Sequence, residues 1–134
     1  MSDRSELIEL HNRLSKTLDE ERGAAREKRY EKGYRTAREN LDDLVDKDSF
    51  VEYGQLAIAA QKSRRELEEL RTETAADGII TGFGKINSEI LDDKKALTAI
   101  IINDYSVLAG TQGYYHHKKL DRICETAEKQ NLPV

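Results

Sequence analysis

The sequence predicts an α+β fold in which an N-terminal helical arm precedes an incomplete β-β-α unit. Leucines at helical spacing predict the arm, two strand-forming segments lie in the middle of the chain, and residues 114–130 predict a closing helix. A chain of 134 residues with 37% hydrophobic and 36% charged residues is long enough for one domain. We place the arm at residues 1–48 and the β-β-α unit at residues 49–134.

The arm is expected to begin with one long helix over residues 1–32. Four leucines recur at intervals of three or four residues, at Leu7, Leu10, Leu14 and Leu18. Residues 19–32 are nearly all charged or small, and a helix with so little apolar surface has little reason to be stable alone. We therefore expect the arm to pack on another part of a larger protein or on a second copy.

Three further elements are expected between residues 36 and 71. Thr36 with Glu39 three positions later is a capping box, which predicts that a second helix begins at Thr36. Residues 49–53 alternate weakly in polarity and predict a short strand ended by Gly54. Residues 55–71 have a helix-forming composition and predict a third helix.

The β-β-α unit is completed by two strands and a helix. Residues 79–86 are strand formers interrupted by Gly82 and Gly84, as in a bent or closely approached strand. Residues 99–102 form an apolar run typical of a strand buried on both faces. The helix at 114–130 carries its core side at Leu120, Ile123, Cys124 and Ala127. Residues 131–134 resemble the entry to another strand, so we expect the chain to be cut from a longer one.

Composition excludes several function classes. The net charge of −4 argues against general nucleic-acid affinity through a cationic surface. No segment approaches the roughly 20 apolar residues of a membrane span, and the N-terminus lacks the pattern of a signal peptide. A single cysteine cannot form an internal disulfide, which favours the reducing cytoplasm.

Four segments, taken in order, resemble the opening of the carboxyltransferase subunit of biotin-dependent acyl-CoA carboxylases. This family includes the propionyl-, acetyl- and methylcrotonyl-CoA enzymes and related decarboxylases, and the resemblance covers about residues 5–134. The segments are Lys-Gly-Tyr-Arg-Thr-Ala-Arg-Glu-Asn-Leu at 32–41, Asp-Ser-Phe-Val-Glu at 48–52, Asp-Gly-Ile-Ile-Thr-Gly-Phe-Gly at 77–84 and Asn-Asp-Tyr-Ser-Val-Leu-Ala-Gly-Thr at 103–111.

The resemblance implies a crotonase-like fold, of which residues 49–134 would be the first part of the carboxyltransferase N-domain. It implies transfer of a carboxyl group from carboxybiotin to the α-carbon of an acyl-CoA. Biotin would be carried by a partner, so the implied partners are biotin carboxylase and biotin carrier components, the remainder of the carboxyltransferase, and further copies in a homo-oligomer. The family's glycine-rich oxyanion segment would follow Leu132, so these residues alone are not expected to catalyse the reaction.

Candidate CoA-binding residues lie in the loop before the last helix and in a basic segment of the arm. Backbone amides in a glycine loop that leads into a helix suit phosphates or a thioester oxygen, although an ordinary strand-to-helix loop has the same form. Residues 22–38 carry a local surplus of five positive charges, which suits CoA phosphates, an acidic partner or simply solvent. The candidates are Leu108, Ala109, Gly110, Thr111 and Gly113 in the loop, with Arg35 and Arg38 in the basic segment.

No residue is assigned to catalysis or to a metal. His116 and His117 are adjacent on a helix, point about 100° apart, and are interpreted as surface or interface residues. Asp104 follows a buried strand, where it is expected to anchor the loop by accepting backbone N–H bonds. Two alternative functions remain open: a non-catalytic subunit-assembly domain, and a subunit of a related biotin-dependent acyl-CoA decarboxylase.

Overall fold

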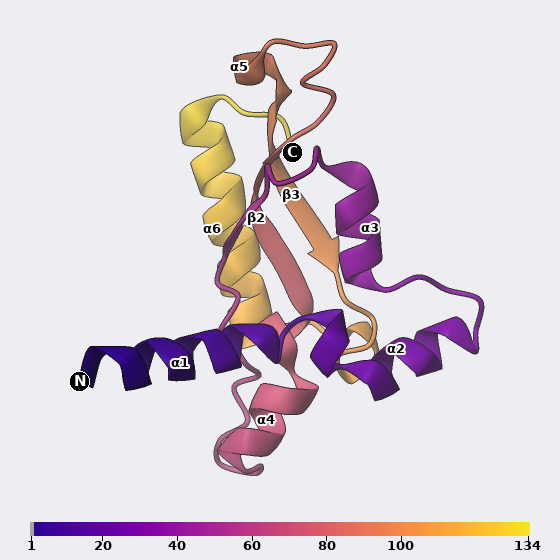
Figure 1. Ribbon diagram of the computed structural model, residues 1–134, viewed down its shortest axis with the longest axis vertical. Coiled ribbons are helices and arrows are strands. Elements are labelled where there is room, and N and C mark those ends of the chain that lie inside the picture. The colour runs from indigo at the N-terminus through magenta and orange to yellow at the C-terminus, as the bar shows by residue number, and fades with distance from the viewer. Residues whose placement is uncertain (1) are drawn as a thin grey trace.

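A computed structural model describes residues 2–134, which form helices around a small antiparallel sheet (Figure 1). The α-helices are α1 (Ser2–Ser15), α2 (Gly23–Tyr30), α3 (Ala37–Leu44), α4 (Leu67–Glu73), α5 (Asp93–Ala96) and α6 (Tyr114–Gln130). The 3₁₀ turns are η1 (Asp19–Glu21), η2 (Ala75–Gly78) and η3 (Leu108–Gly110), and the strands are β1 (Val51–Tyr53), β2 (Ile79–Lys85) and β3 (Leu97–Asn103).

The sheet has the order β1-β2-β3, and both neighbouring pairs are antiparallel. Helix α3 covers one face and α6 the other (Figure 1). Successive residues of β3 point to opposite faces, so Ile100 packs in a cluster with Ala37 and Leu41 of α3, whereas Ala99 packs with Ile123 and Ala127 of α6. The apolar run in β3 is therefore buried from both sides, as its composition predicts.

Gly82 is the point at which β2 is most closely approached. A Cβ atom built there would lie 2.2 Å from the carbonyl oxygen of Val51 and 2.6 Å from the ring of Phe50. A side chain of any size would push β1 and Phe50 away from β2. The prediction of a closely approached strand is confirmed.

Local signals at the starts and ends of elements are confirmed in several places. The Thr36 hydroxyl accepts a hydrogen bond from the backbone N–H of Glu39, and the Glu39 carboxylate accepts one from the backbone N–H of Thr36. The short strand β1 ends just before Gly54, and α6 has the predicted bounds. After α6, the Pro133 carbonyl accepts a hydrogen bond of 2.9 Å from the Ala99 N–H, so the last residues lie beside β3.

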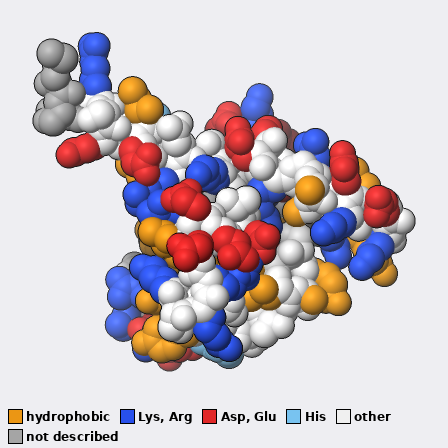
Figure 2. Space-filling view, turned by 90° about the horizontal axis from the view of Figure 1, so that it is seen from below, with side chains coloured by type: hydrophobic (Ala, Val, Ile, Leu, Met, Phe, Trp, Pro, Cys, Tyr) orange, Lys and Arg blue, Asp and Glu red, His pale blue; other side chains and the backbone are white. Residues whose placement is uncertain are grey.

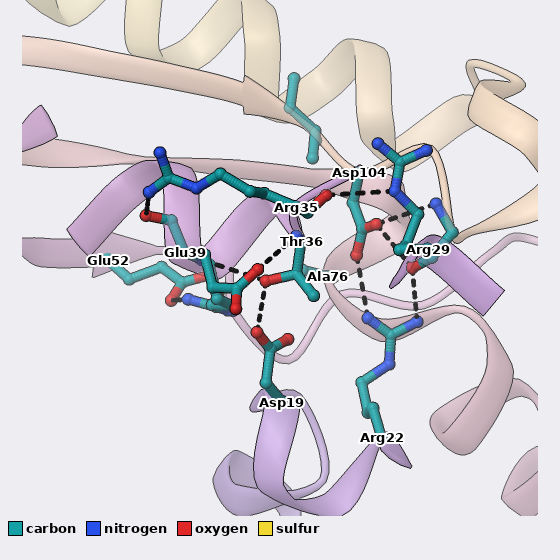
Figure 3. Close-up of polar contacts among 12 residues, drawn as sticks. Asp19, Arg22, Arg29, Arg35, Thr36, Glu39, Glu52, Ala76 and Asp104 are labelled. Carbon is teal, nitrogen blue, oxygen red and sulfur yellow. Dashed lines mark hydrogen bonds and ion pairs between the residues drawn. The ribbon is translucent and has the colours of Figure 1, made fainter. Parts of the chain in front are cut away.

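The prediction of one helix over residues 1–32 is wrong. Helix α1 ends at Ser15, and the chain turns before η1 and α2. Thr17 at this turn is buried, and its hydroxyl accepts a hydrogen bond of 2.7 Å from the side-chain amide of Gln55. The Asp19 carboxylate accepts a hydrogen bond from the Thr36 hydroxyl (Figure 3). The turn is thus fixed by residues distant in sequence, which local helix signals do not contain.

The prediction of a helix over residues 55–71 is also wrong, because only α4 is helical there and the preceding residues form turns. Ala59 is buried, and its N–H donates a 3.0 Å hydrogen bond to the buried Thr74 hydroxyl. Cys124 was expected in the core but is exposed. The buried face of α6 lies at His116, Lys119, Ile123 and Ala127, one position away from that cysteine.

Within the described residues, no helix combines the length and apolar character required to cross a membrane.

Candidate ligand-binding groove

A groove of about 540 Å³ separates α2 from the loop between β3 and α6. Its arm side carries four cationic side chains, at Arg22, Lys28, Arg29 and Lys32. Its loop side includes Tyr105, Leu108 and Ala109, and two carboxylates, Glu21 and Glu73, also line it. Charges of both signs are intermixed over the lower face of the molecule (Figure 2), so the cationic character is local to the groove.

A buried ion pair joins the two sides of the groove. Arg22 Nη1 donates a 2.9 Å hydrogen bond to Asp104 Oδ2, and the two side chains are only 7% and 14% exposed (Figure 3). Asp104 Oδ1 accepts hydrogen bonds from the backbone N–H and the hydroxyl of Ser106. The prediction that Asp104 anchors the loop is confirmed, but its arginine partner in the arm was not foreseen.

Only some of the loop residues predicted to bind CoA line the groove. Leu108 and Ala109 line the groove, whereas Gly110, Thr111 and Gly113 lie outside its lining. Leu108, Ala109 and Gly110 all have left-handed backbone angles, with φ of 47°, 52° and 78°. Such a run is unusual for residues other than glycine, so the loop must be held by its surroundings.

Gly113 precedes the first turn of α6, and an internal carboxylate lies at this helix end. Asp77 Oδ2 accepts a 2.9 Å hydrogen bond from the backbone N–H of His116, and both Asp77 oxygens lie 3.2 Å from where a Gly113 Cβ would stand. The carboxylate partly neutralises the positive end of the α6 dipole. Attraction of an anion to the groove therefore depends mainly on the cations of the arm.

The two arginines predicted from the basic segment do not line the groove. Arg35 is exposed and pairs with Asp43 at 3.1 Å. Arg38 forms a two-pronged ion pair with Glu52, and these side chains are 14% and 8% exposed. The arginines are therefore engaged with the body of the protein, and other basic residues face the groove.

The cations that remain near the groove differ in their partners. The Arg29 guanidinium lies over the rings of Tyr34 and Tyr105, at 4.8 Å and 5.6 Å from their centres. Lys28 and Lys32 are exposed and form no ion pair with another described residue. These two lysines are the cations most available to an incoming anion.

The interpretation of the two adjacent histidines as surface or interface residues is wrong for His116, which is 1% exposed inside this chain, whereas His117 is exposed. His116 Nδ1 lies 3.2 Å from the Asp77 carbonyl oxygen. Lys119, one helical turn later, is also buried, and burial lowers its pKa to about 8 although nearby Glu52 opposes this. The sequence signal for the burial of both side chains is their spacing, which places them with Ile123 on one face of α6.

Among the described residues, no group of three or more His, Cys, Asp or Glu side chains is arranged to hold a metal ion.

The model of the family described as "Carboxyl transferase domain" matches residues 28–134. The chain belongs to this family. It is 35% identical over 129 residues to the biotin-dependent acetyl-/propionyl-coenzyme A carboxylase beta5 subunit of Mycobacterium leprae, covering 96% of this chain and 22% of that subunit. It is 30% identical over 126 residues to the methylmalonyl-CoA decarboxylase subunit alpha of Veillonella parvula, covering 93% and 23% of the two chains.

Two solved structures show the similarity of this chain to members of the family in three dimensions. A single-chain, multi-domain long-chain acyl-CoA carboxylase superposes with a TM-score of 0.94 and 49% identity, over 96% of this chain and 13% of that one. The transcarboxylase 12S hexamer with methylmalonyl-coenzyme A bound gives a TM-score of 0.66 and 27% identity, over 95% and 22% of the two chains. The fold is thus part of a crotonase-like carboxyltransferase, and the chain spans about a fifth of the length of the curated relatives it matches, 22% for the subunit above.

Proposed function

We propose that these residues are the N-terminal portion of an acyl-CoA carboxylase carboxyltransferase. The whole enzyme would move a carboxyl group from carboxybiotin to the α-carbon of an acyl-CoA. The observation that carries this proposal is the TM-score of 0.94 with the long-chain acyl-CoA carboxylase, over 96% of the chain. In this proposal residues 1–48 form the helical arm and residues 49–134 the first part of the carboxyltransferase N-domain.

The contribution of this chain to the reaction would be to hold part of the CoA. The phosphates of CoA fit the groove because Lys28 and Lys32 are exposed there, beside Arg29, and form no ion pair within the described part of the chain. The pantetheine arm would then run along the backbone of the loop. The proposed loop contacts are Leu108, Ala109, Gly110, Thr111 and Gly113.

The two arginines of the basic segment would have different parts in binding. Arg35 is exposed, so it can exchange Asp43 for a phosphate at little cost. Arg38 would have to leave a buried ion pair with Glu52, which is strongly unfavourable. We therefore assign Arg38 an indirect part, in which its ion pair with Glu52 holds β1 against α3.

The further components belong to the proposal as well. The names of the relatives support biotin as the carboxyl carrier, and the 12S hexamer supports a homo-oligomer. The partners that we propose are biotin carboxylase, biotin carrier components and the remainder of the carboxyltransferase. The cations of the groove fit the phosphates of CoA, and we place no biotin-binding residue in this chain. The single cysteine supports a cytoplasmic location.

The test is calorimetric titration of the full-length carboxyltransferase with an acyl-CoA. Lys28→Gln combined with Lys32→Gln is expected to weaken binding about tenfold or more, because two charge-assisted contacts to phosphate are lost. Lys94→Gln combined with Lys129→Gln is the matched control, since these exposed lysines do not line the groove. Equal affinity of the two double variants would exclude the groove as the phosphate site.

A second titration tests the loop. Gly110 has a φ of 78°, and a Cβ there would lie 3.0 Å from the Tyr105 ring, so Gly110→Val should disturb the loop and weaken CoA binding. Gly33 has a φ of 73° with nothing within 4 Å, so Gly33→Val introduces similar backbone strain away from the loop. If both variants bind acyl-CoA as the parent does, the loop is not part of the site.

The decarboxylase is the second candidate, because the chain is 30% identical to a methylmalonyl-CoA decarboxylase subunit over 126 residues. The two are separated by supplying the full-length protein with either carboxybiotin and an acyl-CoA, or biotin and a carboxylated acyl-CoA. Faster turnover of the first pair supports the carboxylase. Absence of CoA binding in all titrations would instead favour a non-catalytic assembly domain.

A further inference from the structure

The turn η2 has an unusual backbone for a buried segment. Ala76 and Asp77 have φ of 54° and 48°, and Gly78 follows with a φ of 73°. Ala75 to Gly78 are all buried. Left-handed conformations are unfavourable for residues with a side chain and persist only where the surroundings hold them. The surroundings of this turn therefore show which groups enforce its shape.

Side chains from one face of α6 hold the turn. Lys119 Nζ donates a hydrogen bond of 2.8 Å to the Ala76 carbonyl and a second one to the Ile79 carbonyl. The His116 ring nitrogen lies 3.2 Å from the Asp77 carbonyl, and the His116 N–H donates to the Asp77 carboxylate. The carbonyls on both sides of the turn thus have partners on α6, and the Asp77 side chain fixes the first turn of that helix.

The turn is also in direct contact with the loop between β3 and α6. The Gly78 carbonyl accepts a 2.8 Å hydrogen bond from the Asp104 N–H, and a Cβ on Gly78 would lie 3.3 Å from the buried Val107 side chain. Val107 immediately precedes the second left-handed run, at Leu108 to Gly110. A change in the shape of η2 would therefore be transmitted to the loop through two adjacent contacts.

We propose that Lys119 and Asp77 are positioning residues for the loop Leu108–Gly113. They hold the left-handed turn η2 against α6. Through its contacts with Asp104 and Val107, the turn then sets the backbone angles of the loop. This inference rests on the proposed function, in which the same loop contacts the acyl-CoA. Neither residue lines the groove, so both act through the backbone and not by touching the ligand.

The charges around Lys119 fit a fixed ammonium group. Its desolvation is opposed by the carboxylates of Glu52 and Asp77, while the Arg38 guanidinium acts in the other direction. Its stem is also confined, because a Cβ on Gly54 would lie 3.0 Å from Lys119 Cε. A side chain so confined, with two carbonyl acceptors, has little freedom to take another position.

The experiment uses the full-length carboxyltransferase with three variants. Lys119→Met removes the donors and keeps the length of the stem. Asp77→Asn keeps the shape of the side chain but removes its charge, which weakens the acceptor for the His116 N–H. Lys118→Met is the control, because Lys118 is the exposed neighbour on the same helix. Two variants are used so that a folding failure of Lys119→Met still leaves Asp77→Asn as a test.

The first measurement is hydrogen exchange, which does not require a ligand. In the loop, the N–H groups of Val107, Gly110 and Thr111 are hydrogen-bonded to backbone carbonyls. We expect their protection to fall about tenfold or more in Lys119→Met and Asp77→Asn, and to stay unchanged in Lys118→Met. Protection of α3 should stay at the parent level in all three, because α3 lies on the opposite face of the sheet (Figure 1).

The second measurement is steady-state kinetics, in which a displaced loop should raise the KM for acyl-CoA about tenfold and leave kcat within about threefold. Unchanged loop protection in both variants, or an equal loss in α3 and the loop, would overturn the proposal and leave a merely structural role. Lost protection with an unchanged KM would overturn the link to acyl-CoA. Absence of acyl-CoA binding by the parent would instead refute the proposed function, while the exchange data would still decide whether Lys119 and Asp77 position the loop.

Discussion

Removing the Asp104 carboxylate should destabilise the protein strongly, because it leaves a buried arginine without its counter-charge. Arg22 Nη1 lies 2.9 Å from Asp104, and the arginine side chain is only 7% exposed. Its Nε atom is buried with no hydrogen-bond partner in the described part of the chain, and Nη2 contacts the Ser106 hydroxyl at 3.2 Å. In Asp104→Ala the guanidinium would keep only that hydroxyl.

The size of the effect follows from the cost of an unpaired buried charge. Breaking a buried pair by removing one partner costs about 3–5 kcal/mol, and we expect Asp104→Ala to fall in this range. Replacing both partners removes the buried charge as well, so Arg22→Met combined with Asp104→Ala should recover about half of that loss or more. The Ser106 N–H loses its acceptor in both cases, which limits the recovery.

The assay is urea denaturation followed by circular dichroism, with the free energy of unfolding taken from the midpoint at constant slope. A double-mutant cycle of parent, Arg22→Met, Asp104→Ala and the double variant gives the coupling energy. A loss below about 1 kcal/mol for Asp104→Ala, or simple additivity in the double variant, would refute the reasoning.

Three further predictions concern local features. Gly82→Ala should lower the free energy of unfolding by about 3 kcal/mol or more, because its Cβ would lie 2.2 Å from the Val51 carbonyl oxygen. Gly84→Ala meets a movable side chain at 3.1 Å and should lower it by about 1 kcal/mol. Equal urea midpoints for the two variants would contradict this prediction. Thr36→Ala should lower the free energy of unfolding by about 1–2 kcal/mol, and Thr36→Ser should lower it much less because serine keeps the capping hydroxyl. Equal melting temperatures for the two variants would show that the cap does not stabilise the protein. The pKa of Lys119 is lowered from 10.5 in the unfolded chain to about 8 in the folded protein, so the unfolded chain binds more protons between these two pH values. The free energy of unfolding should therefore rise by up to about 3 kcal/mol as the pH is raised from about 8 to 10.5. That rise should be missing from urea titrations of Lys119→Met, and its persistence there would disprove the assignment.

The features that could be predicted from the sequence depend on residues close together in the chain. The Thr36 cap needs only Glu39 three positions later, and α6 begins after a glycine loop and follows its apolar spacing to Gln130. The glycines of β2 indicated a close approach, although the sequence did not show that Phe50 and Val51 make it. The family was also recognisable from four short segments, because each keeps its own residue pattern.

The features that the sequence did not predict depend on contacts between distant residues. Thr17 and Gln55 are 38 positions apart, and their hydrogen bond lies at the break between α1 and α2. Arg22 and Asp104 are 82 positions apart, and their ion pair places the cations of the arm beside the loop. His116 is buried beside η2, where Asp77, 39 positions earlier, accepts a hydrogen bond from its backbone N–H and has its carbonyl 3.2 Å from the His116 ring nitrogen.

The sequence by itself determined the three strands of the sheet, the Thr36 cap, the last helix and the family of this protein, since propensity, periodicity and capping act within a few residues. Only the tertiary structure decided that the arm bends, that Leu108 and Ala109 face Lys28 and Lys32 across a groove, and that Lys119 is buried under η2. The physical reason is that burial and ion pairing depend on which side chains meet in space. Residue patterns along the chain do not specify these side-chain contacts when the partners are tens of residues apart.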